Sequence, residues 1–151
     1  YLGVHFPTDV LAGWTIGAFL LIFAMTVQPA VEKRVGELSL YTQILLALAV
    51  PLMLLLIHPV KSTTATMAAL AGAGAGLAVT HRYVSFSVRG PWWQRVARFL
   101  IGGTVIFALY LSLTMVVPGD GSALYLVFIH YGIIGVWISL GAPWLFQLLR
   151  I

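Results

Sequence analysis

A histidine and an aspartate lie four residues apart near the start of the chain, at His5 and Asp9. An imidazole can act as a nucleophile or a proton carrier. A carboxylate one helical turn away can hold the ring in one tautomer and stabilise the positive charge that develops on it. Alternatively, Asp9 is simply an acidic residue in the first turn of a helix, where the helix dipole favours it, and His5 is an interfacial loop residue. The spacing alone leaves both interpretations open.

The composition indicates that the surroundings of this pair are a lipid bilayer. The 151 residues are 61% hydrophobic and 8% charged, and the mean hydropathy is +1.02. Such a chain has too little polar surface to cover a water-soluble globule of its length. The absence of cysteine excludes disulfides, thiolate metal sites and cysteine nucleophiles. We therefore expect an all-α polytopic membrane protein.

The number of spans follows from the thickness of the bilayer. A hydrocarbon core of about 30 Å needs about 20 helical residues, and the clusters of charge, proline and glycine divide the chain into five such lengths. We expect Gly141-Ala142-Pro143 to kink or end the last span. The expected spans cover roughly residues 8–31, 39–57, 63–80, 91–117 and 122–140.

The distribution of cations predicts the orientation. With five spans, the N-terminus, the 58–62 loop and the 118–121 turn share one side of the membrane, and Lys61 is the only lysine or arginine there. By the positive-inside rule the other side is cytoplasmic. We thus expect an integral protein of the cytoplasmic (inner) membrane with His5 and Asp9 on the outer side and the C-terminus inside. The cytoplasmic cations would be Lys33, Arg34, Arg82, Arg89, Arg95, Arg98 and Arg150.

The string YLGVHFPTDVLAGW at residues 1–14 closely resembles the third signature of the PAP2 (phosphatidic acid phosphatase type 2) superfamily, Ser-Arg-x5-His-x3-Asp. The resemblance implies that His5 attacks phosphorus to form a phosphohistidine and that Asp9 orients it. It also implies that residues 1–31 are the last core helix of such a phosphatase, and that residues 32–151 form a four-helix transmembrane extension. The 81–98 segment and Gly141-Ala142-Pro143-Trp144 look like the C-terminal extension of some bacterial PAP2 proteins.

Other parts of a phosphate site are missing from these residues. The signature's arginine would fall two residues before Tyr1, and the family's first and second signatures, Lys-x6-Arg-Pro and Pro-Ser-Gly-His, do not occur. A metal-free phosphoryl transfer needs positive groups at the phosphate. The first cation, Lys33, follows a helix of about 22 residues and would lie on the order of 30 Å away. We therefore expect these 151 residues to be inactive alone.

Two functions remain open on this reasoning. One is the C-terminal part of a membrane phosphatase that hydrolyses a lipid phosphate or polyprenyl pyrophosphate at the outer face. The other is a non-catalytic membrane subunit or scaffold that retains PAP2 ancestry. Neither requires a cofactor, and the four histidines show no metal-ligand spacing. The expected partners are membrane lipids and the lipid phosphate substrate, with other membrane subunits or a homo-oligomer as alternatives. The few, scattered charges argue against nucleic acid.

Four further features have two interpretations each. The arginines and aromatic residues of the 81–98 segment suit recognition of anionic headgroups or a partner, or simple interfacial anchoring. His130, inside the last span, could relay protons or line a polar path, or bond a neighbouring helix as a neutral imidazole. His58 and Lys61 could bind anions or anchor their loop. Small residues one helical turn apart, as at Gly72 and Gly76 or Gly13 and Gly17, predict close helix packing within the chain or between copies.

Overall fold

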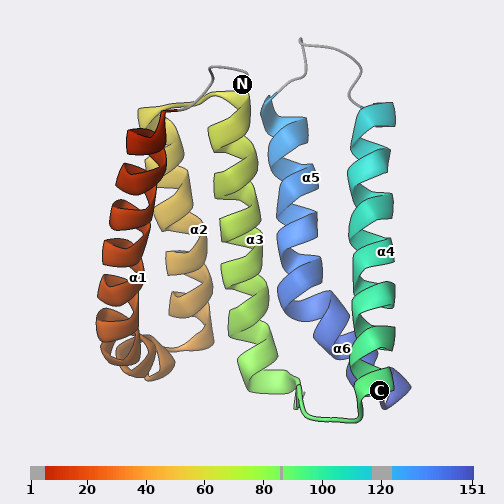
Figure 1. The fold of residues 1–151 in the computed structure, drawn as a ribbon. Helices are drawn as coiled ribbons and strands as arrows, with labels where there is room; N and C mark the ends of the chain where they lie inside the picture. Colours follow the sequence, from red (N-terminus) through yellow and green to blue (C-terminus); the bar gives the residue numbers. More distant parts are fainter. Residues whose placement is uncertain (1–5, 86, 117–123) are drawn as a thin grey trace. The chain divides into compact units, whose positions relative to one another are not determined.

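The computed structural model describes residues 6–85, 87–116 and 124–151, and within them it contains helices and no strand. Five of its helical stretches are long and apolar enough to cross a membrane, in agreement with the five predicted spans. The protein is therefore an all-α, polytopic membrane protein, as predicted. In chain order the elements are α1 (Pro7–Gly36), α2 (Leu40–Ile57), α3 (Lys61–Tyr83), α4 (Trp92–Val116), α5 (Leu124–Val136), η1 (Trp137–Gly141) and α6 (Ala142–Leu149) (Figure 1).

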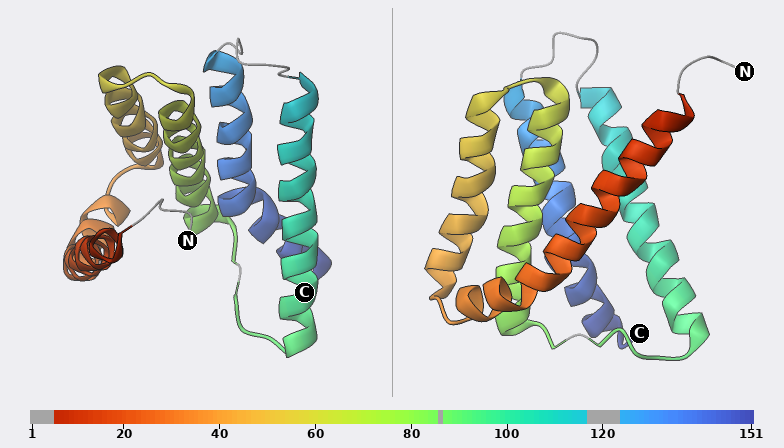
Figure 2. Two further views of the ribbon diagram at one scale, coloured as in Figure 1. Left: turned by 45° about the horizontal axis from the view of Figure 1, so that its top comes forward. Right: turned by 60° about the vertical axis from the view of Figure 1, so that its left-hand side comes forward.

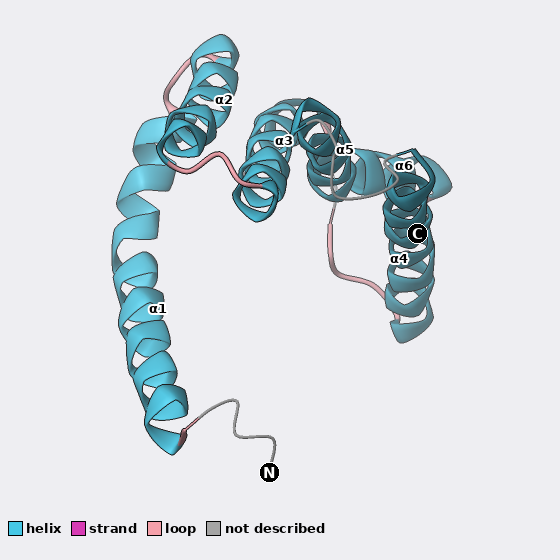
Figure 3. Cartoon of the chain, turned by 90° about the horizontal axis from the view of Figure 1, so that it is seen from above, coloured by secondary structure: helices cyan, strands magenta, loops and turns pink. Residues whose placement is uncertain are grey.

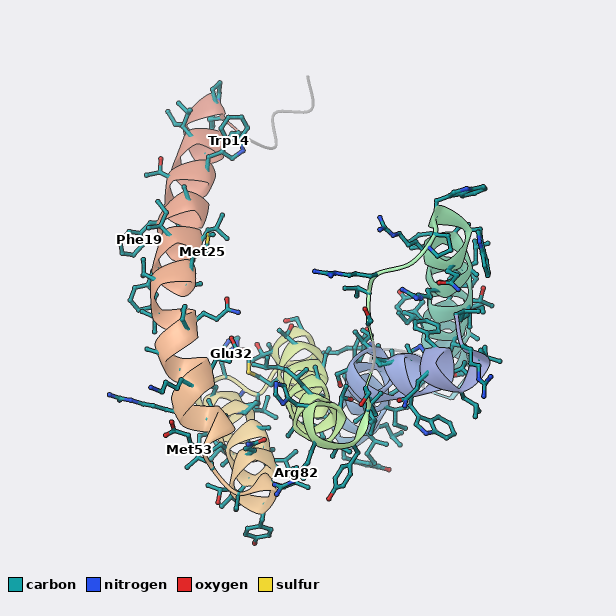
Figure 4. All side chains as sticks on the ribbon, turned by 90° about the horizontal axis from the view of Figure 1, so that it is seen from below. Trp14, Phe19, Met25, Glu32, Met53 and Arg82 are labelled. Carbon is teal, nitrogen blue, oxygen red and sulfur yellow. The ribbon has the colours of Figure 1, made fainter. Side chains whose placement is uncertain are left out.

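The chain divides into two compact units, Tyr1–Ser39 and Leu40–Ile151. The first contains a single long helix, α1. Pro7 stands in its first turn, where the missing N–H is not needed, and Lys33 and Arg34 stand in its last turn, where the helix dipole favours cations. No residue of α1 is buried, and apolar side chains such as Trp14, Phe19 and Met25 project from different sides of it (Figure 4). A helix that is apolar all round is suited to a lipid environment.

In the second unit the helices run up and down the bundle. α3 packs between α2 and α5, and α4 lies beyond α5 (Figures 1 and 3). The connection between α3 and α4 and the C-terminus lie at one end of this unit, and the connection between α2 and α3 lies at the other (Figure 1). This end-to-end alternation is the one that the five-span prediction requires.

The closest helix packing joins α3 to α5, through residues without bulky side chains. A Cβ added at Gly72 would collide with the backbone carbonyl of Gly132, and one added at Gly76 would collide with the hydroxyl of Ser139. Both glycines are buried, as are Ala68 and Ala71. Intramolecular packing is thus confirmed for the glycine run in α3. A Cβ added at Gly13 or Gly17 in α1 would meet no atom within 4 Å.

The last span differs from its predicted bounds. It was expected to finish near residue 140, but it continues to Leu149 through the π-helical segment η1, so the prediction of an end was wrong and that of a kink was correct. Figure 2 shows the bend between α5 and α6. Pro143 has no N–H to donate to the carbonyl four residues earlier, which belongs to Ser139. Thr80 Oγ1 in α3 donates a hydrogen bond to this Ser139 carbonyl at 2.7 Å. A side chain of a neighbouring helix thus supplies the donor that proline lacks, which lets the helix bend without ending.

Replacing Thr80 by valine should destabilise this bend. Valine keeps the shape of the side chain but cannot donate to the Ser139 carbonyl, so we expect the free energy of unfolding to fall by roughly 0.6 to 1.7 kcal/mol, the range for hydrogen bonds between membrane helices. Reversible unfolding in mixed detergent micelles measures the change. Thr80→Ser keeps the hydroxyl and serves as the control; an equal loss in both variants would contradict the role of the hydrogen bond.

Candidate functional site

Of the two predicted catalytic residues, the structure describes Asp9, whereas His5 lies outside the described residues. Asp9 is in the first turn of α1 and is exposed. Its Oδ2 atom accepts a hydrogen bond from the backbone N–H of Phe6 at 2.9 Å, and its own N–H donates to the Phe6 carbonyl at 2.9 Å. The carboxylate therefore satisfies one of the unpaired backbone donors at the start of the helix.

This capping role is the structural alternative considered for Asp9, and it is compatible with the catalytic one. A carboxylate has two oxygens and about four acceptor positions, so it can cap a helix and accept a bond from an imidazole as well. The bond to Phe6 fixes the carboxylate at the helix start, four residues after His5 in the chain. The contact between Asp9 and His5 stays a prediction.

No cation of α1 lies near this helix start. The basic residues of α1 are Lys33 and Arg34 in its last turn. At 1.5 Å per residue, Lys33 is roughly 35 Å along the helix from Asp9. The expectation that Lys33 cannot hold a phosphate at His5 is consistent with this single continuous helix.

The second unit of the chain matches a known protein family. Residues 64–151, more than half of the chain, match the family described as PAP2 superfamily phosphatase, transmembrane extension. The chain belongs to the PAP2 superfamily. The suspected relationship is thereby confirmed. No curated protein and no solved structure matches the chain.

The match to the PAP2 extension covers a different part of the chain from the His5 and Asp9 string. It begins at Thr64 inside α3 and includes α4, α5, η1 and α6. The string that resembles the third PAP2 signature lies wholly before it. Two separate regions thus point to the same superfamily, and the match itself assigns no role to His5 or Asp9.

His130 makes a polar contact between helices of the PAP2 extension. Its Nε2 atom lies in hydrogen-bonding contact with the backbone carbonyl of Leu109 in α4. The same carbonyl accepts a hydrogen bond from Ser112 Oγ at 2.7 Å. Because a carbonyl only accepts, the imidazole must carry a proton on Nε2 to bond it. The predicted bond to a neighbouring helix is confirmed, and it accounts for this histidine without a proton relay.

His58 and His81, the other described histidines, lie at different places in the second unit. His58 Nδ1 lies 3.5 Å from Thr63 Oγ1, across the connection between α2 and α3, which agrees with the predicted loop anchor. His81 lines a cavity of about 490 Å³ beside Thr80 and Ser139. Within residues 6–85, 87–116 and 124–151 no group of three metal-ligating side chains occurs.

A larger cavity, of about 640 Å³, lies at the start of α4. Three arginines and Val88 from the 81–98 segment line it together with Phe99 and Phe146. Sequence reasoning singled out the 81–98 segment but missed Phe146, which comes from α6. The only sequence signal for Phe146 was the predicted topology, which places the C-terminus on the same side of the membrane as this segment.

Proposed function

We propose that this chain is the C-terminal part of an integral membrane phosphatase of the PAP2 type. In this proposal His5 is the nucleophile, and Asp9 orients its ring and stabilises the imidazolium. The imidazole forms a bond to phosphorus as the bond to the leaving oxygen breaks, and water then cleaves the phosphohistidine to release phosphate. The observation that carries the proposal is the family match at residues 64–151, in a chain whose separate first residues resemble the third PAP2 signature.

We also propose that residues 1–31 belong to the catalytic core and residues 32–151 to the transmembrane extension. The division of the chain into units after Ser39 lies near this boundary and supports the arrangement, because the long helix that contains Asp9 belongs to a separate unit from the other helices. In a PAP2-type enzyme the remaining phosphate-binding groups would come from polypeptide outside these 151 residues.

The substrate we propose is a lipid phosphate or polyprenyl pyrophosphate, hydrolysed at the outer face of the inner membrane. Asp9 lies at the very start of a membrane helix, where a lipid headgroup is within reach. The proposed sidedness is supported by the second unit, in which Lys61 lies at one end and the five arginines belong to elements at the other.

Two observations favour the non-catalytic alternative. The matched family is the transmembrane extension and not the catalytic core. In addition, the lysine and arginine of α1 lie in its last turn, far from Asp9 in the first. A membrane scaffold that lost its phosphate-binding residues would have these properties too.

Phosphate release by the intact protein separates the two functions. We expect protein purified from its own membrane, with its intact mass recorded, to release inorganic phosphate from phosphatidic acid or from undecaprenyl pyrophosphate without added metal. A polypeptide whose mass shows that it begins at Tyr1, with no copurifying chain and no phosphate release, would support the scaffold and contradict the phosphatase.

A further inference from the structure

The cavity at the start of α4 combines positive charge with apolar walls. Its charged lining consists of Arg89, Arg95 and Arg98, and its apolar lining consists of Val88, Phe99 and Phe146. Phe99 is 77% exposed and Phe146 only 8%. Isolated interfacial anchors would not line one common cavity, as these charged and apolar side chains do.

Hydrogen bonds from Arg98 join α4 to the loop that precedes it. Arg98 donates from Nη1 to the Val88 carbonyl at 3.1 Å and from Nη2 to the Arg89 carbonyl at 3.5 Å. Gly90 lies so close to Gln94 and Arg98 that a Cβ there would contact both side chains. Arg98 therefore ties the loop to α4 and holds Arg89 at the cavity.

The apolar side of the cavity is fixed by α6. A Cβ added at Gly102 would lie 3.5 Å from the Phe146 ring, in ordinary van der Waals contact, so the ring lies beside this part of α4. The bend at η1 directs α6 toward the start of α4 (Figure 2). Trp137 Nε1 also donates to the Gly102 carbonyl at 3.4 Å, which joins η1 to α4 at the same level.

The second unit of the chain carries an excess of positive charge. Residues 40–151 contain six lysines and arginines but a single acidic residue, Asp120. An anion bound in the cavity would be attracted by the positive charges of Arg89 and Arg95.

The surroundings of the cavity favour a lipid anion over a soluble one. Trp92 and Trp93 precede it on α4 and are exposed, as interfacial anchors are. Phe99 stands further along α4, toward the hydrocarbon. A phospholipid needs both parts of such a site, guanidinium groups for its phosphate and apolar side chains for the first carbons of its acyl chains. A soluble anion needs only the first part.

We propose that this cavity is a binding site for one anionic phospholipid, whose phosphate bonds the arginines and whose acyl chain packs on Phe99. The site is distinct from the proposed catalytic residues, because all of its lining residues belong to the second unit. It does not depend on phosphatase activity.

Native mass spectrometry of the intact protein, titrated with phosphatidylglycerol and separately with phosphatidylcholine, tests the proposal. We expect one phosphatidylglycerol to bind more tightly than phosphatidylcholine, and Arg95→Gln to weaken that first binding event about fivefold, as expected for loss of one interfacial cation. Arg82→Gln is the matched control. It removes the same charge from the same end of the unit, but Arg82 does not line the cavity and lies on the α2 and α3 side, away from α4 (Figure 4).

Equal weakening by the two glutamine variants would overturn the site in favour of a general basic surface, and so would no weakening by either. Displacement of the lipid by millimolar inorganic phosphate would show a soluble-anion site instead. A dimer that phosphatidylglycerol dissociates, and that Arg95→Gln abolishes, would make the cavity an interface between copies.

If Arg95→Gln does not fold, Phe99→Ala replaces it. This variant should weaken phosphatidylglycerol binding severalfold. Phe107→Ala, at an exposed residue of the same helix that does not line the cavity, should not; equal effects of the two would also contradict the proposal.

Discussion

Replacing His5 by alanine in the intact polypeptide is expected to abolish phosphate release, with a loss of at least about three orders of magnitude in kcat. Alanine cannot form the covalent bond to phosphorus, and without the nucleophile only uncatalysed attack by water remains. Residues 6–36 should keep their helix, because the capping bond joins Phe6 to Asp9 and does not involve the His5 side chain. Malachite-green detection of phosphate measures the rate, and circular dichroism checks the helix content.

Two further substitutions accompany His5→Ala, one at its proposed partner Asp9 and one as a control. Asp9→Asn keeps an oxygen that can accept from the Phe6 N–H, so it preserves the cap while removing the charge that stabilises the imidazolium. We expect it to lower kcat by about 10²- to 10⁴-fold without loss of folding. His58→Ala, which changes a histidine of a connecting loop, should leave kcat within about twofold. Retained turnover in His5→Ala would contradict the assignment of the nucleophile.

Replacing Gly135 by alanine is expected to weaken the packing of α5 on α3 strongly. Gly135 is buried in α5, and its added Cβ would collide with the backbone carbonyl of Ala69 and with the backbone N of Ala73 in α3. Since backbone atoms cannot swing aside, the two helices must separate, at a cost of about 1–3 kcal/mol for overpacking. Reversible unfolding in mixed micelles measures this cost.

Gly132 offers a matched control on the same helix, one turn earlier. A Cβ added there would come no closer than 3.8 Å to any neighbouring atom, the Ala68 carbonyl oxygen, which is ordinary van der Waals contact. Gly132→Ala should therefore leave the free energy of unfolding unchanged, or raise it slightly, because alanine favours the helix. If the two variants were equally stable, the close approach of α3 and α5 would be contradicted.

Much of the fold could be predicted from the sequence because a bilayer imposes strong constraints on it. Long apolar segments must be helical to satisfy their backbone groups, so cutting the chain at charges and at proline and glycine found all five spans. The end of the last span was missed for a specific reason. The effect of Pro143 depends on whether another helix can serve the Ser139 carbonyl, and Thr80, which does so, lies 59 residues earlier in the chain.

Less of the candidate site than of the fold could be predicted from the sequence. The spacing of His5 and Asp9 left their role open, and the resemblance of residues 1–14 to the third PAP2 signature is what predicts a catalytic pair there. The helix cap made by Asp9 could not be distinguished from catalytic orientation, because an acidic residue in the first turn suits both roles. The cavity at the start of α4 could be recognised only from the three-dimensional structure. Phe146 reaches it only because the chain bends at η1, which no local pattern in residues 81–98 reports.

Trapping of the covalent intermediate tests the central claim most directly. The intact protein would be mixed briefly with phosphate-labelled phosphatidic acid, quenched in alkali and digested, and the labelled peptide would be identified by mass spectrometry. The account predicts a phosphoryl group on the peptide that contains His5, stable in alkali, lost in acid and absent from His5→Ala. Phosphate release without any adduct on that peptide, or an adduct on another residue, would contradict it.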